Sequence, residues 1–451
     1  MSSRGAKLAW AAAIAAYFCY FAVGALAVKF APDDLMNLDY YWKLGPAKLL
    51  LTLVAPWKGG YRPMGGFYYL PLLRLFGLNP APYHAVTLAL LAANAYLVYR
   101  LARALRCSET ASAVAAVLVC YHSGLNFLYY NTSFIYDVLC TFFYLAAFVY
   151  YARQRADGGT LSRGQLAIFL ALYWCALNSK EMAVTMPAVL LAYEWLYEKR
   201  PSIRAVVWTA ALAAPIALRV VIGSGALVQI PDYQPEFSIA RVAAFQRDAF
   251  SDFFLTWHFF TTGWMLAVWV VTTVLAWWPK RPALRFCWCW LVLTPIPIEF
   301  LSGRTNACLA LPLCGLAVLA AGAFTELARA VSGPRKLVFA GIVAAGVCLW
   351  TVRNVELKQR LIVPQMRDLG RETWAAITGL EALHPQVRPH STVIFLNDPF
   401  EDFDMAFIAD LCFRQPDVYI KLRRKTPVGP EELAKADHLF GYEGGRLTQV
   451  R

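Results

Sequence analysis

Residues 8–34, LAWAAAIAAYFCYFAVGALAVKFAPDD, decide the fold class. The apolar run reaches Phe30, so as a helix it is long enough to cross a hydrocarbon core of about 30 Å. Two acids, Asp33 and Asp34, follow at once. Ionisable groups near a membrane are costly unless they face a cavity or a partner. The pair therefore indicates a functional site in the segment after the first span.

The composition of the whole chain is that of a helical membrane protein. Of the 451 residues, 59% are hydrophobic and only 16% are charged, whereas a soluble protein has about a quarter charged residues. The formal net charge of +13 is attributed to basic cytoplasmic loops, so no nucleic-acid partner is expected. The eleven cysteines show no metal-binding or redox spacing, and no metal ligand is assigned.

We predict an all-α polytopic membrane domain over residues 1–352, with about eleven transmembrane helices. The predicted spans are 8–30, 83–100, 111–129, 134–152, 164–178, 182–197, 203–222, 253–278, 284–301, 306–328 and 336–352. The apolar segment 64–78 is short and contains Pro71 and Arg74. It is interpreted as a re-entrant or surface piece of the first external loop, 31–82.

The distribution of basic residues predicts the orientation in the membrane. Lys and Arg gather in alternate loops, at 100–106, 153–163, 199–204, 280–285 and 329–336. Cytoplasmic loops carry such an excess, so the N-terminus is expected inside and the tail outside. The first apolar segment shows no clear cleavage site and is interpreted as a retained anchor. A bacterial inner membrane is the expected location, with the endoplasmic reticulum as the alternative.

The tail, 353–451, has the composition of a small soluble α/β domain, expected on the outer face. A helix is predicted over 367–383 and a buried strand over 391–396, followed by an acidic turn at 397–404. A helix to Phe413 and a strand over 417–422 complete a βαβ unit. Residues 436–450 are predicted to form a hairpin around Gly444 and Gly445.

Polar and charged residues gather at the predicted outer ends of the spans. This set includes Asp33, Asp34, His84, His122, Asp137, Lys180, Glu181 and Arg304. Any one of them could be an ordinary interfacial residue or helix cap. Their shared depth favours a polar site that opens to the outer face.

Several short tracts, taken in order, resemble the GT-C superfamily of membrane glycosyltransferases. They are the acidic pair at 33–34, Tyr-Arg-Pro-Met at 61–64, Gly-Leu-Asn-Pro at 77–80 with Tyr-His at 83–84, His122 with Asp137, Ser-Lys-Glu at 179–181, and Arg304 before Leu-Pro at 311–312. The nearest resemblance is to the tetratricopeptide-linked transmembrane O-mannosyltransferases and their bacterial relatives, over about residues 10–325. The chain departs from them at Ser123, where proline is usual, and its tail lacks the repeats.

The resemblance implies an inverting transferase that uses a polyprenyl-phosphate sugar as co-substrate, without a tightly bound cofactor. The acceptor hydroxyl is expected on a protein, lipid or glycan at the outer face, and the metal requirement is left open. Asp33 or Asp34 is the expected base, and the site is expected to face the bilayer that holds the donor. Arg304, Lys180 and Arg62 are the candidates for binding the donor phosphate; Glu181, His84, His122, Asp137 and Tyr61 are the candidates for lining the pocket.

Two other classes of function stay open. A transporter or lipid flippase would place charged residues at mid-span and show repeat symmetry between its halves; neither feature is evident in the sequence. A non-catalytic scaffold with the GT-C fold would present the tail outside without transferring sugar. Sugar transfer that depends on the acidic pair distinguishes the enzyme from both.

Overall fold

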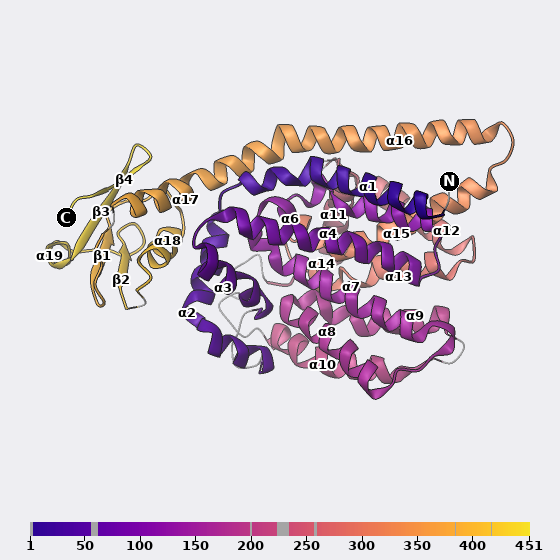
Figure 1. The fold of residues 1–451 in the computed structure, drawn as a ribbon, viewed down its shortest axis with the longest axis horizontal. Coiled ribbons are helices and arrows are strands. Elements are labelled where there is room, and N and C mark those ends of the chain that lie inside the picture. Colours follow the sequence, from indigo (N-terminus) through magenta and orange to yellow (C-terminus); the bar gives the residue numbers. More distant parts are fainter. Residues whose placement is uncertain are drawn as a thin grey trace.

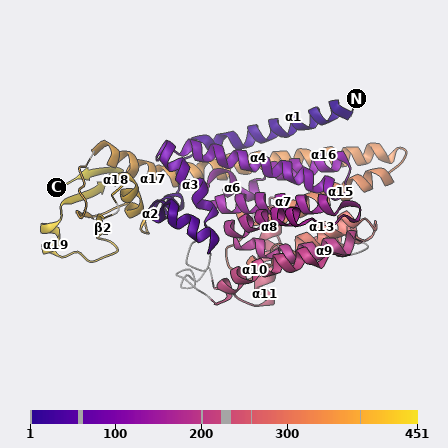
Figure 2. The ribbon, with the colours of Figure 1, turned by 60° about the horizontal axis from the view of Figure 1, so that its bottom comes forward.

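The computed structural model describes residues 3–55, 62–198, 201–222, 234–256, 259–383, 385–415 and 417–451. It has two parts, a bundle of long helices and a small sheet domain at the end of the bundle remote from the N-terminus (Figure 1). A second view shows the same division along the long axis (Figure 2). The predicted fold class, a helical bundle with a small C-terminal α/β part, is confirmed.

Each predicted span has a helical counterpart. The bundle helices are α1 (Ser3–Ala22), α4 (Pro80–Ala104), α5 (Glu109–Cys120), α7 (Ile135–Arg155), α8 (Arg163–Ser179), α9 (Met186–Tyr197), α10 (Ile203–Ile222), α12 (Thr262–Trp277), α13 (Pro282–Leu293), α15 (Ala310–Ala330) and α16 (Arg335–Leu357). Among the described residues, five segments are long and apolar enough to cross a membrane: Leu8–Ala27, Pro80–Ala104, Thr132–Arg155, Asn306–Ala330 and Arg335–Leu383. The count of about eleven spans stays a prediction.

The segment between the first two predicted spans is helical where the structure describes it. It forms α2 (Pro32–Val54) and α3 (Met64–Phe76), so 64–78 is a helix that starts and ends close to the predicted bounds. Helix α2 starts with two ordinary signals. Pro32 occupies its first turn, and the Asp34 carboxylate accepts a hydrogen bond from the Ala31 amide. A kink divides α2 at Gly45, whose φ of 71° suits glycine, and Pro46 follows it.

Several span ends differ from the prediction. The predicted span 111–129 ends as a helix at Cys120, and three short turns follow: η3 (Ser123–Leu125), α6 (Phe127–Tyr130) and η4 (Thr132–Phe134). The predicted span 253–278 begins late, at Thr262, because an amphipathic helix that was not predicted, α11 (Ile239–Phe253), precedes it. The predicted span 284–301 is interrupted between α13 and α14 (Ile296–Glu299), where prolines disfavour a continuous helix.

The last predicted span does not stop at 352. Helix α16 continues through the π-turn η10 (Lys358–Ile362) into α17 (Val363–Leu383). Pro364 lies just after the π-turn, where the altered hydrogen-bond pattern tolerates a residue without an amide proton. The bundle and the sheet domain are therefore joined by a helix (Figure 1), which the sequence interpretation had divided in two.

The tail forms the predicted α/β unit. Its strands are β1 (Thr392–Phe395), β2 (Tyr419–Leu422), β3 (His438–Glu443) and β4 (Arg446–Gln449), in the order β2-β1-β3-β4. β1 is parallel to β2 and β3, and α18 (Asp404–Phe413) lies between β1 and β2 in the chain. The β3–β4 hairpin turns at Gly444 and Gly445, both with positive φ. A short helix, α19 (Pro430–Lys435), was not predicted.

The sheet domain packs on the end of the bundle that carries the acidic pair. The Thr373 hydroxyl of α17 donates to the Phe30 carbonyl at 2.5 Å. Lys29 lies 3.9 Å from the centre of the Trp374 ring, a cation–π contact. From α2, the Lys43 ammonium reaches Asp410 of α18 at 2.5 Å. These contacts hold both ends of the segment that carries Asp33 and Asp34.

Candidate functional site

Asp34 is a buried carboxylate with both oxygens in use. One oxygen accepts from the Ala31 amide at 2.8 Å, and the other accepts from the Thr132 hydroxyl at 2.5 Å. Burial raises the pKa of Asp34 to about 7, although these hydrogen bonds oppose the shift. Asp34 is thus suited to fixing the start of α2 against the turn before α7.

Asp33 lies at the surface, next to Asp34 but on another side of the helix. The protein around Asp33 removes part of its hydration, and the charge of Asp402 adds to this effect; together they raise the pKa of Asp33. The positive charge of Arg304 opposes them. An accessible carboxylate with a raised pKa has the properties required of a general base.

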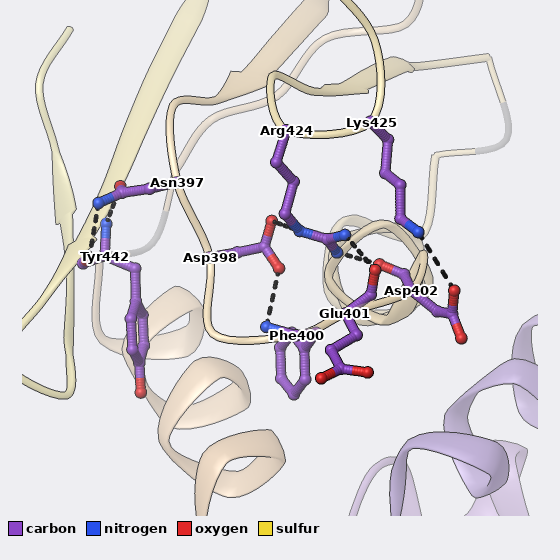
Figure 3. A network of polar contacts seen from close by, with 8 residues as sticks. All are labelled: Asn397, Asp398, Phe400, Glu401, Asp402, Arg424, Lys425 and Tyr442. Atoms are coloured by element: carbon purple, nitrogen blue, oxygen red, sulfur yellow. Dashed lines mark hydrogen bonds and ion pairs between the residues drawn. The ribbon is translucent and has the colours of Figure 1, made fainter.

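Asp402 belongs to the acidic turn after β1, which is held in shape by two basic side chains (Figure 3). The Arg424 guanidinium donates to the Asp398 carboxylate at 2.8 Å and to the main-chain carbonyls of Glu401 and Asp402. Lys425 lies 3.2 Å from the Asp402 carboxylate.

The sequence predicted this acidic turn but did not connect it with the site. Asp404 follows at the start of α18: desolvation, the charge of Asp402 and the charge of Asp33 raise the pKa of Asp404. The sequence did contain a signal for this connection. Acidic residues directly follow a buried strand, and α/β folds place binding groups at that position.

Arg62, just before α3, and Glu181, at the start of the short helix η6 (Glu181–Thr185), form an ion pair. The Arg62 Nη2 and Nε atoms lie 2.8 and 3.2 Å from one Glu181 oxygen. The guanidinium also lies 5.2 Å from the centre of the Tyr136 ring. Arg62 has a φ of 41°, a backbone conformation that residues other than glycine rarely adopt. The ion pair and the ring contact hold this backbone in place.

Lys180 and Asp137 form a second, more buried pair. The ammonium lies 2.5 Å from the carboxylate and 3.3 Å from the Cys308 sulfur. Lys180 follows the end of α8, Asp137 lies in the first turn of α7, and Cys308 lies in the short helix η9 (Asn306–Leu309) just after Arg304. The pair therefore connects the Ser-Lys-Glu tract with the segment that carries Arg304.

Tyrosines connect these charged groups with α2. The Tyr41 hydroxyl donates to the Arg62 carbonyl at 2.8 Å and lies 3.1 Å from the Tyr136 hydroxyl, which donates to Asn37 at 2.9 Å. A Cβ added at Gly65 would lie 2.3 Å from the Tyr136 ring and 2.6 Å from the Tyr41 oxygen. The close contact of the α3 backbone with these two tyrosines therefore requires glycine at this position.

The two histidines are buried in the protein interior and do not contact the described charged groups of the site. The His122 Nδ1 accepts from the Gly124 amide at 3.1 Å, and Nε2 lies 3.2 Å from the Phe253 carbonyl. His84 is fully buried in the first turns of α4. Tyr61 lies outside the described residues. Within the described part of the chain, no group of three or more His, Cys, Asp or Glu side chains could hold a metal ion.

Comparisons with known proteins agree with a GT-C fold. No family model matches the sequence, and no curated protein matches it either. ArnT from Cupriavidus metallidurans, solved bound to undecaprenyl phosphate, has a TM-score of 0.56 at 14% identity, covering 93% of this chain and 86% of ArnT. In its apo state the TM-score is 0.58 at 13% identity, covering 98% and 94%.

An apo oligosaccharyltransferase from Archaeoglobus fulgidus is also similar, with a TM-score of 0.49 at 12% identity over 91% of this chain and 64% of that one. We draw nothing further from a TM-score this low. ArnT is a GT-C glycosyltransferase, so the chain has the fold of that superfamily. Together with the long apolar helices, this fold makes the chain an integral membrane protein.

Proposed function

We propose that this protein is a glycosyltransferase that moves a sugar from a polyprenyl-phosphate donor to an acceptor hydroxyl at the outer membrane face. The observation that carries the proposal is the similarity of the fold to that of ArnT, with an accessible Asp33 at the start of α2. The positive charge of Arg304 acts on Asp33, and this end of the bundle is the one predicted to face outward. The structure of ArnT with undecaprenyl phosphate supports a lipid phosphate as the carrier of the sugar.

In the proposed reaction Asp33 is the general base. Its carboxylate takes the proton from the acceptor hydroxyl while the hydroxyl oxygen attacks the anomeric carbon of the donor. The bond between that carbon and the phosphate oxygen breaks, and the polyprenyl phosphate leaves with the bonding electrons. A single displacement of this kind inverts the anomeric centre.

Arg304 is the proposed cation for the leaving phosphate. A guanidinium can bind two phosphate oxygens at once, and a fixed positive charge stabilises the negative charge that develops as the bond breaks. Arg62 and Lys180 already bind carboxylates. They are proposed as secondary contacts, because their remaining N–H groups can still donate to a phosphate oxygen.

The finer assignment, an O-mannosyltransferase-like donor and acceptor, rests on the resemblance of the short tracts. The tract that carries it best is Ser-Lys-Glu at 179–181, whose Lys180 and Glu181 both enter the ion pairs of the site. The acceptor is proposed to be a hydroxyl of a protein, lipid or glycan.

A binding experiment tests the role of Arg304. We expect Arg304→Ala to raise the dissociation constant of purified protein for undecaprenyl phosphate by about tenfold, roughly 1.4 kcal/mol. Arg304→Lys should recover part of this loss, because a point charge remains while the bidentate geometry is lost. Arg388→Ala, at an exposed position in the tail, is the matched control. Unchanged affinity in Arg304→Ala at equal folding would refute the assignment.

A reconstitution experiment separates the enzyme from the other classes. Undecaprenyl phosphate mannose with a labelled sugar is placed in vesicles with the protein and with membranes that supply the acceptor. An enzyme releases undecaprenyl phosphate and labels the acceptor. A flippase moves the donor between leaflets with the sugar–phosphate bond intact, and a scaffold does neither.

A further inference from the structure

A cavity of about 500 Å³ lies where the ends of four bundle helices meet. It is formed by the end of α4, the start of α5, the start of α13 and the last turns of α15. Its polar lining includes Arg103, Arg106, Ser108, Arg281, Glu326 and Arg329. Its volume is in the range of ordinary small-molecule sites.

This cavity is remote from the acidic pair. Helix α4 starts beside that pair, where the Phe30 and Tyr83 rings lie 5.0 Å apart. It then runs for 25 residues to Ala104, a length of roughly 37 Å at 1.5 Å per residue. The cavity therefore lies at the opposite end of the bundle, where basic loops predict the cytoplasmic face, and is separate from the proposed sugar-transfer site.

The lining of the cavity carries an excess of positive charge. Four arginines surround it, and Glu326 is the one acidic side chain among the lining residues, all of which the structure describes. Glu326 is shared between Arg281 at 3.2 Å and Arg329 at 2.8 Å. Arg103 donates to the Cys107 carbonyl at 2.6 Å, which holds its guanidinium at the rim.

Helix dipoles do not account for this excess. The starts of α5 and α13 bring their positive ends to the cavity, whereas the ends of α4 and α15 bring their negative ends. Each terminus carries about half a unit charge, so the four largely cancel. The arginine side chains therefore decide the sign of the potential, and an anion is the fitting ligand.

We propose that this arginine-lined cavity binds the phosphate group of an anionic phospholipid. Arginine binds phosphate oxygens in a bidentate geometry, and basic pockets between transmembrane helices are suited to anionic head groups. The wall between α13 and α15 is closely packed, because a Cβ at Gly322 would lie 2.7 Å from Leu284. This inference does not depend on the proposed sugar transfer.

The same chemistry could bind phosphate from a soluble compound, so the test has two arms. The purified full-length protein, in a neutral detergent, is titrated with cardiolipin or with pyrophosphate and followed by native mass spectrometry. The main variant is the double substitution Arg103→Gln with Arg329→Gln. The control is Arg153→Gln, an exposed arginine in the last turn of α7 on the same predicted side.

We expect the double variant to bind cardiolipin at least tenfold more weakly, while Arg153→Gln binds like the wild type. Glu326→Gln should have the opposite effect and tighten binding by about threefold, because it releases two arginines from a competing carboxylate. A change of opposite sign cannot come from misfolding. Equal cardiolipin binding by all variants would overturn the proposal, and arginine-dependent binding of pyrophosphate alone would overturn the lipid assignment.

Discussion

Two adjacent aspartates have different surroundings because they start a helix. Successive residues on a helix point about 100° apart, so Asp34 faces the turn before α7 while Asp33 faces outward. The hydrogen bonds of Asp34 are internal, to Ala31 and Thr132. The resemblance pointed to the pair without choosing between its members; the surroundings of the two side chains are the reason why Asp33 is the proposed base.

The first prediction separates the two aspartates. Asp33→Asn should lower the transfer rate by about 10²- to 10⁴-fold, the usual contribution of a general base, while the protein inserts and folds normally. Asp34→Asn should keep measurable transfer but lower the free energy of unfolding by about 1–3 kcal/mol, because the amide group meets a buried donor. Transfer rates and thermal unfolding at equal protein level are the measurements. Wild-type transfer by both variants would show that the pair is not catalytic.

The second prediction concerns pH. A base works when it is deprotonated, so the transfer rate should rise with pH through the pKa of Asp33, above the ordinary aspartate value of about 3.9. Asp402 helps to raise that pKa. Asp402→Asn should therefore move the acid limb of the rate to lower pH.

Glu401→Gln is the control for this pH shift. Glu401 is an exposed neighbour of Asp402 in the same turn, but its charge is not among the causes that shift the pKa of Asp33. The two pH profiles are measured side by side. A shift of equal size in both variants would mean that only the overall charge of the turn matters, contrary to the expectation.

At the scale of elements, the docking of α18 on α2 connects the tail with the acidic pair. Lys43 lies between Asp39 at 2.9 Å and Asp410 at 2.5 Å, and both carboxylates are buried. Removing the ammonium leaves two buried acids without their cation. The geometry of α2, and with it that of Asp33, should then loosen.

The third prediction follows from this contact. Lys43→Met should lower the transfer rate several-fold and make the tail more sensitive to protease, while affinity for undecaprenyl phosphate stays unchanged. The stability effect should be only about 1–2 kcal/mol, because Lys43 is partly exposed and screened by water. Lys48→Met, an exposed lysine on the same helix, is the control. If both variants behave alike, the Lys43 contact does not position the site.

At the scale of the whole molecule, the bundle has two chemically different ends. One end carries the acidic pair, the ion pairs of Arg62 and Lys180 and the sheet domain. The other carries the arginine-lined cavity. The positive-inside rule assigns the second end to the cytoplasm.

The fourth prediction tests this orientation. Single cysteines are placed at Thr160 and at Glu401, both exposed, in a background without the native cysteines. A membrane-impermeant thiol reagent should label the Glu401 position in intact cells, and the Thr160 position only after the membrane is opened. The reverse pattern would invert the topology and move the proposed reaction to the cytoplasm.

The sequence determined much of the architecture because its signals are local. Apolar runs set the helices, alternate basic loops set the predicted orientation, and strand and turn patterns gave the tail its βαβ unit and hairpin. The start of α2 could also have been predicted from local signals, because its first turn contains proline and aspartate. The prediction still treated that segment as a loop, since a membrane surface is where loops are expected.

Only the tertiary structure decided how the site is assembled. No local pattern pairs Arg62 with Glu181 or brings Asp402 of the tail to Asp33, since those residues are far apart in the chain and meet through packing. The same holds for the cavity, whose arginines come from three separate segments of the chain: the end of α4 and the residues after it, the residue before α13, and the end of α15. Charge and hydropathy along a chain report depth in the membrane. Which side chains face each other at that depth depends on how the helices pack, and no single segment carries that information.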